Sequence, residues 1–148
     1  MNVEAHIKTE KPIPLKSKTI IHLSLVQNKI NERFHAALKP FDISLQQFNV
    51  LRILRGQKGA PANLNTINER MVTKMSNTTR LVDKLIIKDF VARQICENNR
   101  RKVEIFITEK GLVALAEIDT IMNQTEQVIL EGFKESELVQ LNELLDKL

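Results

Sequence analysis

Two neighbouring stretches of this 148-residue chain gather side chains that can bind an anion. In the first stretch, polar and cationic residues recur at helical spacing opposite the apolar positions: Asn77, Arg80, Lys84 and Lys88. The second stretch is a polar run that contains three cations: Asn98, Asn99, Arg100, Arg101 and Lys102. Guanidinium and ammonium groups pair with phosphate oxygens, so both stretches predict contact with an anionic partner such as a nucleic acid.

The elements that position these side chains are predicted to be a helix and a two-stranded hairpin. Apolar residues at helical spacing over 81–90 predict the helix. Two alternating segments, 91–95 and 103–107, flank the basic run and predict the strands, which places the run at the hairpin tip. A short helix over 64–71, capped by Asn63 or Asn65, precedes the basic helix closely, as in a helix-turn-helix.

The chain before the helix-turn-helix is predicted to form an arm and two helices. Residues 1–16 mix charges with prolines and show no sustained period, which indicates an arm. A helical pattern begins at residue 17 and stops at Pro40, and its apolar positions lie on more than one stripe, which suggests contact with two surfaces. Ser44 and Gln47 form a capping box that opens the next helix.

The chain after the hairpin is predicted to form two further helices. Thr108 can cap a long helix, which Gly132 interrupts. The last helix carries a leucine stripe that runs to Leu148, and such a stripe is expected to be buried against another apolar surface. This surface belongs either to the first or fifth helix of the same chain or to a second copy of the chain. We favour the second copy, with dimerisation through both termini.

Charge is distributed unevenly along the sequence. The net charge is +4, but residues 70–102 carry nine basic and three acidic side chains, whereas residues 103–148 carry three basic and ten acidic ones. A basic central segment joined to an acidic C-terminal segment suggests that positive electrostatic potential is concentrated on one part of the molecule. Accidental clustering of charges on solvated faces is the alternative.

Several classes of protein find no support in the sequence. No apolar run approaches the ~20 residues of a membrane span, and no signal peptide is expected. A single cysteine, Cys96, cannot form an intramolecular disulfide, which fits the cytoplasm. Neither a nucleophile elbow nor a phosphate-binding glycine loop is present, and His22 and His35 lack metal-site spacing. We therefore expect no enzymatic activity, no cofactor and no metal site.

A set of local motifs carries a family resemblance. They are Glu69-Arg70-Met71, Ser76, Thr79-Arg80-Leu81-Val82-Asp83-Lys84-Leu85, Phe90-Val91, Arg93 and Arg100-Arg101-Lys102-Val103-Glu104-Ile105-Phe106-Ile107-Thr108-Glu109-Lys110-Gly111. With the order of the helices, over residues 17–148, they resemble the MarR family of bacterial winged helix-turn-helix regulators. The resemblance implies a mainly α fold with a small β-hairpin wing and with dimerisation helices at both ends. We divide the chain accordingly into an arm (1–16), a dimerisation helix (17–40), a DNA-binding winged helix-turn-helix lobe (44–111) and C-terminal dimerisation helices (112–148).

The expected contacts of the basic helix follow from the way a helix enters the major groove, with its N-terminal side chains at the base edges. Asn77 can bond an adenine edge, Arg80 a guanine edge and Lys84 a phosphate. Local capping is the competing role for Asn77 and Thr79, and an ion pair with Asp83 or Asp89 is the competing role for Arg80. The expected DNA contacts of this helix are Ser76, Asn77, Thr79, Arg80 and Lys84.

The expected wing contacts are cationic and polar, which suits a narrow minor groove because negative potential concentrates there. A solvated loop is the alternative, and by resemblance Arg101 is the residue that enters the groove. The expected wing contacts are Asn98, Asn99, Arg100, Arg101 and Lys102.

The sequence departs from the family pattern at several positions. Asn99 stands where an aspartate usually precedes the wing arginines, so an ion pair that often braces the wing is expected to be missing. Asp89 replaces a common glycine at the end of the basic helix, and aspartate tolerates a left-handed backbone. Lys74 replaces a serine-like cap, which leaves Thr73 or Ser76 to open the helix.

These features predict a homodimeric, sequence-specific regulator that binds an inverted-repeat operator in double-stranded DNA. The resemblance implies a repressor that is relieved by a small aromatic or phenolic effector bound between the dimer helices and the DNA-binding lobe. Apolar residues of the first, second and fifth helices are the expected walls of that site. The alternative function is a winged-helix interaction module whose basic face binds an acidic protein.

Overall fold

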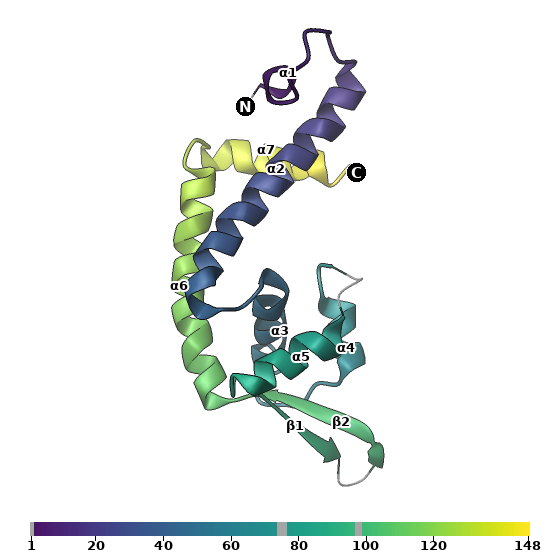
Figure 1. The fold of residues 1–148 in the computed structure, drawn as a ribbon, viewed down its shortest axis with the longest axis vertical. Helices are drawn as coiled ribbons and strands as arrows, with labels where there is room; N and C mark the ends of the chain where they lie inside the picture. The colour runs from purple at the N-terminus through teal and green to yellow at the C-terminus, as the bar shows by residue number, and fades with distance from the viewer. Residues whose placement is uncertain (1, 74–76, 97–98) are drawn as a thin grey trace.

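The computed structural model describes residues 2–73, 77–96 and 99–148, with side chains for all of these except 96 and 99–102 (Figure 1). The fold is mainly helical and has one antiparallel hairpin, which confirms the expected fold class. Its elements are α1 (Val3–His6), α2 (Leu15–Leu38), the 3-10 helix η1 (Lys39–Phe41), α3 (Leu45–Arg55), α4 (Leu64–Arg70), α5 (Thr78–Ile87), β1 (Val91–Cys96), β2 (Asn99–Ile107), α6 (Glu109–Leu130) and α7 (Glu135–Leu145).

The core lies in a compact lobe formed by α3, α4, α5 and the base of the hairpin, closed by the first half of α6 (Figure 1). Leu51 of α3, Ile67 of α4, Leu85 of α5 and Ile105 of β2 are all buried there. Each such side chain contributes about 1.5–3 kcal/mol through removal of apolar surface from water. An ion pair between Arg55 and Asp119 also joins α3 to α6.

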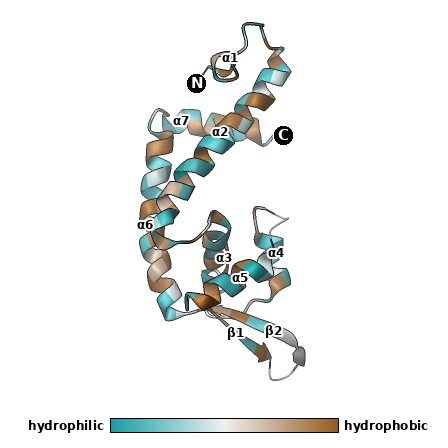
Figure 2. Ribbon diagram, in the orientation of Figure 1, coloured by the Kyte–Doolittle hydropathy of each residue, from teal (hydrophilic) through white to brown (hydrophobic). Residues whose placement is uncertain are grey.

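The helices at the two ends of the chain extend away from this lobe (Figure 1). Within the described chain, α7 buries none of its residues, and Leu141, Leu144, Leu145 and Leu148 all remain exposed along one stripe. Figure 2 shows hydrophobic segments along α2, α6 and α7 outside the lobe. Neither α2 nor α6 of the same chain therefore covers the leucine stripe.

The helix starts follow local capping signals. Ser44 and Gln47 form the expected capping box of α3, and of the two candidate caps for α4 it is Asn63 that accepts from the Thr66 N–H at 2.8 Å. Thr108 caps α6, as expected. The cap of α5 is Asn77 rather than Thr73 or Ser76, so the expected start of this helix was placed too early.

The N-terminal segment contains structure that the sequence pattern did not reveal. The short helix α1 lies within residues 1–16, and α2 begins at Leu15, two residues before the expected start. Val3 is fully buried, and the Lys18 ammonium lies 2.9 Å from the Glu4 carboxylate, which attaches α1 to α2. No helix in the described ranges combines the length and the apolar character that a membrane crossing requires.

The hairpin is longer on its second strand than the sequence pattern indicated. β2 begins at Asn99, inside the basic run that was expected to form the tip, and the register shifts after Ile95, which pairs with Val103. A further bridge joins Ala62 to Ile105 through N–H···O bonds of 3.0 and 2.8 Å. This bridge fixes the hairpin base to the segment before α4.

The junction between hairpin and α6 depends on a close approach at Gly111. A Cβ atom at this position would lie 2.1 Å from the carbonyl oxygen of Phe90. Thr108 donates to the Asp89 carbonyl at 2.6 Å and accepts from the Gly111 N–H at 3.0 Å, so the backbone has little room to shift.

We predict that Gly111→Ala lowers the free energy of unfolding by about 1–3 kcal/mol, the usual cost of forcing extra atoms into a packed site. Urea denaturation followed by circular dichroism measures this change. Gly132→Ala is the control, because an added Cβ there meets no atom within 4 Å. Equal urea midpoints for Gly111→Ala and Gly132→Ala would contradict the close approach of Gly111 to the Phe90 carbonyl.

Candidate nucleic-acid interface

The basic helix α5 is held by one buried face and presents the other to solvent. Val82 and Leu85 are 1% and 0% exposed and pack into the core. Thr79, Arg80 and Lys84 of the same helix are exposed, as their helical spacing predicted. The buried face thus fixes the direction in which the three expected contact residues emerge.

Asn77 has a structural role at the start of α5. Its side-chain oxygen accepts the Arg80 backbone N–H at 3.1 Å, which is the capping role weighed against base contact. A bidentate contact with adenine uses that same oxygen together with the amide nitrogen. Base contact by Asn77 therefore remains a prediction, and Ser76 lies outside the described residues.

Arg80 is not held in either of the ion pairs that competed with a DNA-binding role. Asp83 accepts from Arg93 at 3.1 Å, and Asp89 lies 3.6 Å from the Lys110 ammonium. In the part of the chain that the structure describes, the Arg80 guanidinium has no acidic partner. Its five N–H donors are accordingly open to an external acceptor.

The two helices of the helix-turn-helix are joined by a buried polar contact that the sequence pattern did not reveal. Thr78 is 5% exposed, and its hydroxyl donates to the side-chain oxygen of Asn68 on α4. This bond lies one residue beyond the Asn77 cap, so it fixes the N-terminal turn of α5 against α4. Asn77 and Arg80, the residues expected to contact DNA bases, belong to or adjoin that turn.

The wing is braced to α5 through its first strand. Arg93 of β1 donates to Asp83 of α5 at 3.1 Å, and Gln94 donates to Glu104 across the hairpin at 3.1 Å. Both members of the Arg93–Asp83 pair are about half exposed, which limits its worth to about 1 kcal/mol or less. The pair mainly fixes the orientation of the wing, because it joins one residue of β1 to one residue of α5.

The side chains expected to contact DNA from the wing are outside the described set. Asn98 is not described, and the structure gives only the backbone of Asn99, Arg100, Arg101 and Lys102 within β2. The expected loss of an ion pair at Asn99 therefore stays a prediction. Asp89 does adopt the predicted left-handed backbone, with φ of 59°.

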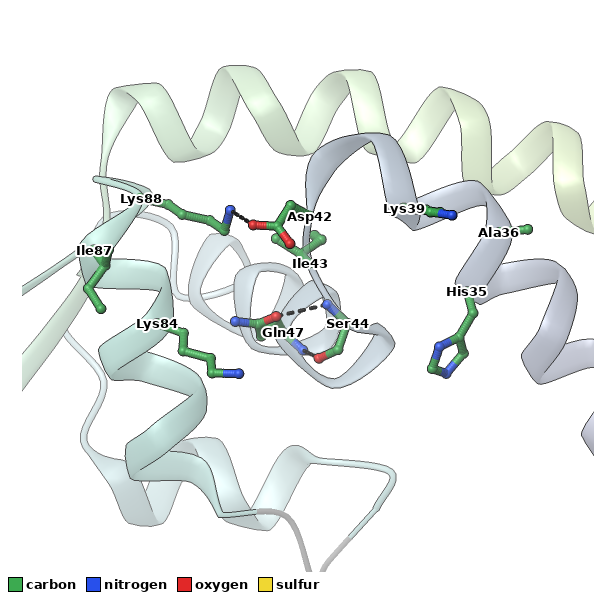
Figure 3. Close-up of a pocket in the computed structure, with 10 residues that line it drawn as sticks. All are labelled: His35, Ala36, Lys39, Asp42, Ile43, Ser44, Gln47, Lys84, Ile87 and Lys88. Atoms are coloured by element: carbon green, nitrogen blue, oxygen red, sulfur yellow. Dashed lines mark hydrogen bonds and ion pairs between the residues drawn. The ribbon is translucent and has the colours of Figure 1, made fainter.

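A cavity of about 680 Å³ lies between the end of α2, the start of α3 and the side of α5 (Figure 3). Its walls differ from the expected ones, because α5 contributes and α6 does not, and because many lining side chains are polar or charged. The lining residues are His35, Ala36, Lys39, Asp42, Ile43, Ser44, Gln47, Lys84, Ile87 and Lys88.

An ion pair lies along one side of this cavity. The Lys88 ammonium, at the C-terminal end of α5, donates to the Asp42 carboxylate at 2.6 Å (Figure 3). Asp42 has a left-handed backbone, with φ of 51°, where η1 leads into α3. The hydrogen bond from Lys88, together with its charge, holds the pKa of the Asp42 carboxyl below its ordinary value.

We expect a carbon-detected NMR titration to place the pKa of Asp42 below the ordinary value of about 3.9, and Lys88→Met to raise this pKa toward that value. Because the folded-state pKa is lowered, the pair contributes stability above the unfolded-state pKa and loses it as the pH falls through the folded-state pKa. Lys39→Met, which removes an unpaired cation of the same cavity, should leave most of the shift. An unchanged pKa in Lys88→Met would contradict the pairing.

Comparisons with known proteins agree with this geometry. Residues 43–103, which span α3 to the hairpin, match the MarR family model. Wild-type MarR from E. coli in its apo form is 26% identical, with a TM-score of 0.69 over 93% of this chain and 98% of that one. A MarR transcription factor from Planctomyces limnophilus is 25% identical, with a TM-score of 0.72 over 93% and 100%.

A third structure supports the fold at lower identity. It is BpsR of Bordetella bronchiseptica, whose DNA binding is described as regulated by 6-hydroxynicotinic acid. This structure is 20% identical and gives a TM-score of 0.79 over 93% of this chain and 96% of that one. The helix-turn-helix and the hairpin thus lie within a segment that matches the MarR family, and the chain shares the fold of the MarR transcriptional regulators.

Proposed function

We propose that this protein is a homodimeric, sequence-specific repressor that places α5 in the major groove and the hairpin wing in the minor groove of double-stranded DNA. The observation that carries the proposal is the outer face of α5, where Arg80 and Lys84 have no acidic partner among the described residues. A free guanidinium suits the two acceptors of a guanine edge, and a free ammonium suits a phosphate.

Support for a dimer comes from the exposed leucine stripe of α7. Leu141, Leu144, Leu145 and Leu148 are between 37% and 86% exposed, and a stripe of this kind needs a cover. A second copy of the chain supplies a matching stripe by two-fold symmetry. Two copies of α5 then face successive major grooves of an inverted repeat, about 34–36 Å apart.

Support for relief by a small molecule comes from the position of the cavity. Its walls belong to the end of α2, which continues toward the proposed dimer interface, and to α5, which carries the proposed base contacts. A ligand that binds one relative placement of these helices more tightly shifts the dimer toward that placement. If the α5 spacing then differs from one helical turn, affinity for the operator falls.

Selection from random duplexes tests the DNA-binding proposal. We expect an enriched inverted repeat with the wild-type protein, and Arg80→Ala should relax preference at one base pair in each half-site by about 1–3 kcal/mol. Enrichment of no motif would instead favour the alternative of an acidic protein partner for the basic face.

The salt dependence of binding to the selected duplex tests the role of Lys84. We predict that Lys84→Ala weakens binding to all sequences alike and reduces the slope of log affinity against log salt by about one unit per half-site. Lys29→Ala, on the exposed surface of α2 outside the lobe, is the charge-matched control. Equal slopes for the two variants would remove Lys84 from the interface.

Sedimentation equilibrium tests the dimer. The double variant Leu141→Glu and Leu145→Glu places charges on the leucine stripe, so we expect a monomer at concentrations where the wild type is dimeric. Glu143→Gln changes the charge of the same helix on the side opposite that stripe and should leave the dimer intact. A dimeric double variant would show that another surface holds the two copies together.

A further inference from the structure

One face of the hairpin changes from buried to solvent-exposed along its length. Arg93 pairs with Ile105, and two residues further along β1, on the same face, Ile95 pairs with Val103. At the inner pair, Ile105 is 1% exposed and Arg93 donates to Asp83 of α5 at 3.1 Å. At the outer pair, Ile95 is 64% exposed, and the hairpin there extends beyond the lobe (Figure 1). An apolar side chain is therefore held outside the core, on the face that contacts α5.

The register shift beyond this outer pair places a cationic stretch of backbone next to Ile95. Ile95 pairs with Val103, but the next residue of β1, Cys96, pairs with Asn99. Residues 100–102 of β2 lie between these two partners, so three residues stand opposite a single step of β1. Their sequence is Arg-Arg-Lys. Extra residues of this kind bend a strand and change the direction of its side chains. Ile95 thus lies where the strand leaves its regular ladder and a run of three cations begins.

The charges around Ile95 decide which kind of surface can cover it. Isolated exposed apolar side chains are common, but this one is followed by three cations of the same hairpin. A purely apolar surface placed over Ile95 would desolvate the neighbouring cations without supplying a counter-charge, which is unfavourable. The minor groove of DNA has phosphates along its edges and deoxyribose C–H groups along its walls. Proteins that bind this groove frequently place apolar side chains in it together with Arg and Lys.

We propose that Ile95 is an apolar contact of the wing, which packs against a deoxyribose wall of the minor groove beside the cations of the hairpin. The contact rests on the proposed function and assigns part of the affinity of the wing to a group without charge. Removal of apolar surface from water releases no counterions, so Ile95 adds to affinity without adding to salt dependence. The Arg93–Asp83 pair attaches the strand to α5, which relates the position of Ile95 to that of the recognition helix.

Affinity for the selected duplex, measured over a range of salt concentrations, tests this contact. We expect Ile95→Ala to weaken binding by about tenfold per half-site at every salt concentration, with an unchanged slope of log affinity against log salt. Ile95→Val keeps most of the apolar side chain and should bind within about threefold of the wild type. Val113→Ala is the control, because Val113 is a comparably exposed apolar residue on α6, at 57%. Equal affinities for Ile95→Ala and Val113→Ala would overturn the proposal.

A threonine at the same position separates the apolar contact from an effect on the strand. Threonine is β-branched and favours strands as isoleucine does, but it has a hydroxyl and fewer apolar carbons. We expect Ile95→Thr to bind the duplex as weakly as Ile95→Ala, with the urea midpoint of the wild type, because Ile95 lies outside the core cluster. Wild-type affinity in Ile95→Thr would show that alanine acts through the strand, and the proposal would be wrong.

Photocrosslinking locates the contact on the DNA. Benzoylphenylalanine in place of Ile95 reacts with C–H bonds within reach of its ketone, so we expect crosslinks to nucleotides of the minor groove in each half-site of the selected duplex. Crosslinks to protein alone would overturn the proposal. Failure of the wild-type protein to bind any duplex would overturn the proposed function and this contact with it. Wild-type binding that none of the Ile95 substitutions affects would overturn the contact alone.

Discussion

Burial of the inner face of α5 is the constraint on which the proposed interface depends. Val82 and Leu85 are almost completely buried, and replacement of a buried leucine by alanine typically costs about 2–5 kcal/mol. Rotation of the helix about its axis would expose this face, so the outward direction of Arg80 and Lys84 is set by packing rather than by surface charge. The backbone positions from which these side chains emerge are accordingly fixed before binding, which reduces the entropy lost on binding.

Three polar contacts then connect α5 to its surroundings at its start, middle and end. Thr78 bonds Asn68 of α4, Asp83 accepts from Arg93 of the wing, and Lys88 donates to Asp42 at the junction with α2. The two ion pairs among these contacts, Arg93–Asp83 and Lys88–Asp42, are partly exposed and contribute little to stability individually. Together they fix the position of α5 relative to α4, to the wing and to the cavity. The cavity beside Lys88 and Lys84 therefore lies at the point where the lobe meets the proposed dimer helices.

The features predicted correctly from sequence are those set by neighbouring residues. The Ser44–Gln47 capping box, the Thr108 cap and the left-handed Asp89 each follow from a local pattern. The start of α5 was misplaced because several polar residues near it can cap a helix, and sequence spacing alone does not choose among them. The Ala62–Ile105 bridge and the Asp42–Lys88 pair join segments more than forty residues apart, so no local pattern contains them. The lining residues of the cavity were not predicted for the same reason, because its walls come from separate helices.

The central claim is that two copies of the chain present their α5 helices to successive major grooves. A spin label at Thr79→Cys, in a Cys96→Ser background, measures the distance between the two helices by double electron-electron resonance on the operator-bound protein. We expect a narrow distribution centred near the helical repeat of DNA, about 34–36 Å after allowance for the label. Absence of dipolar coupling, or a distance unrelated to one helical turn, would contradict the claim.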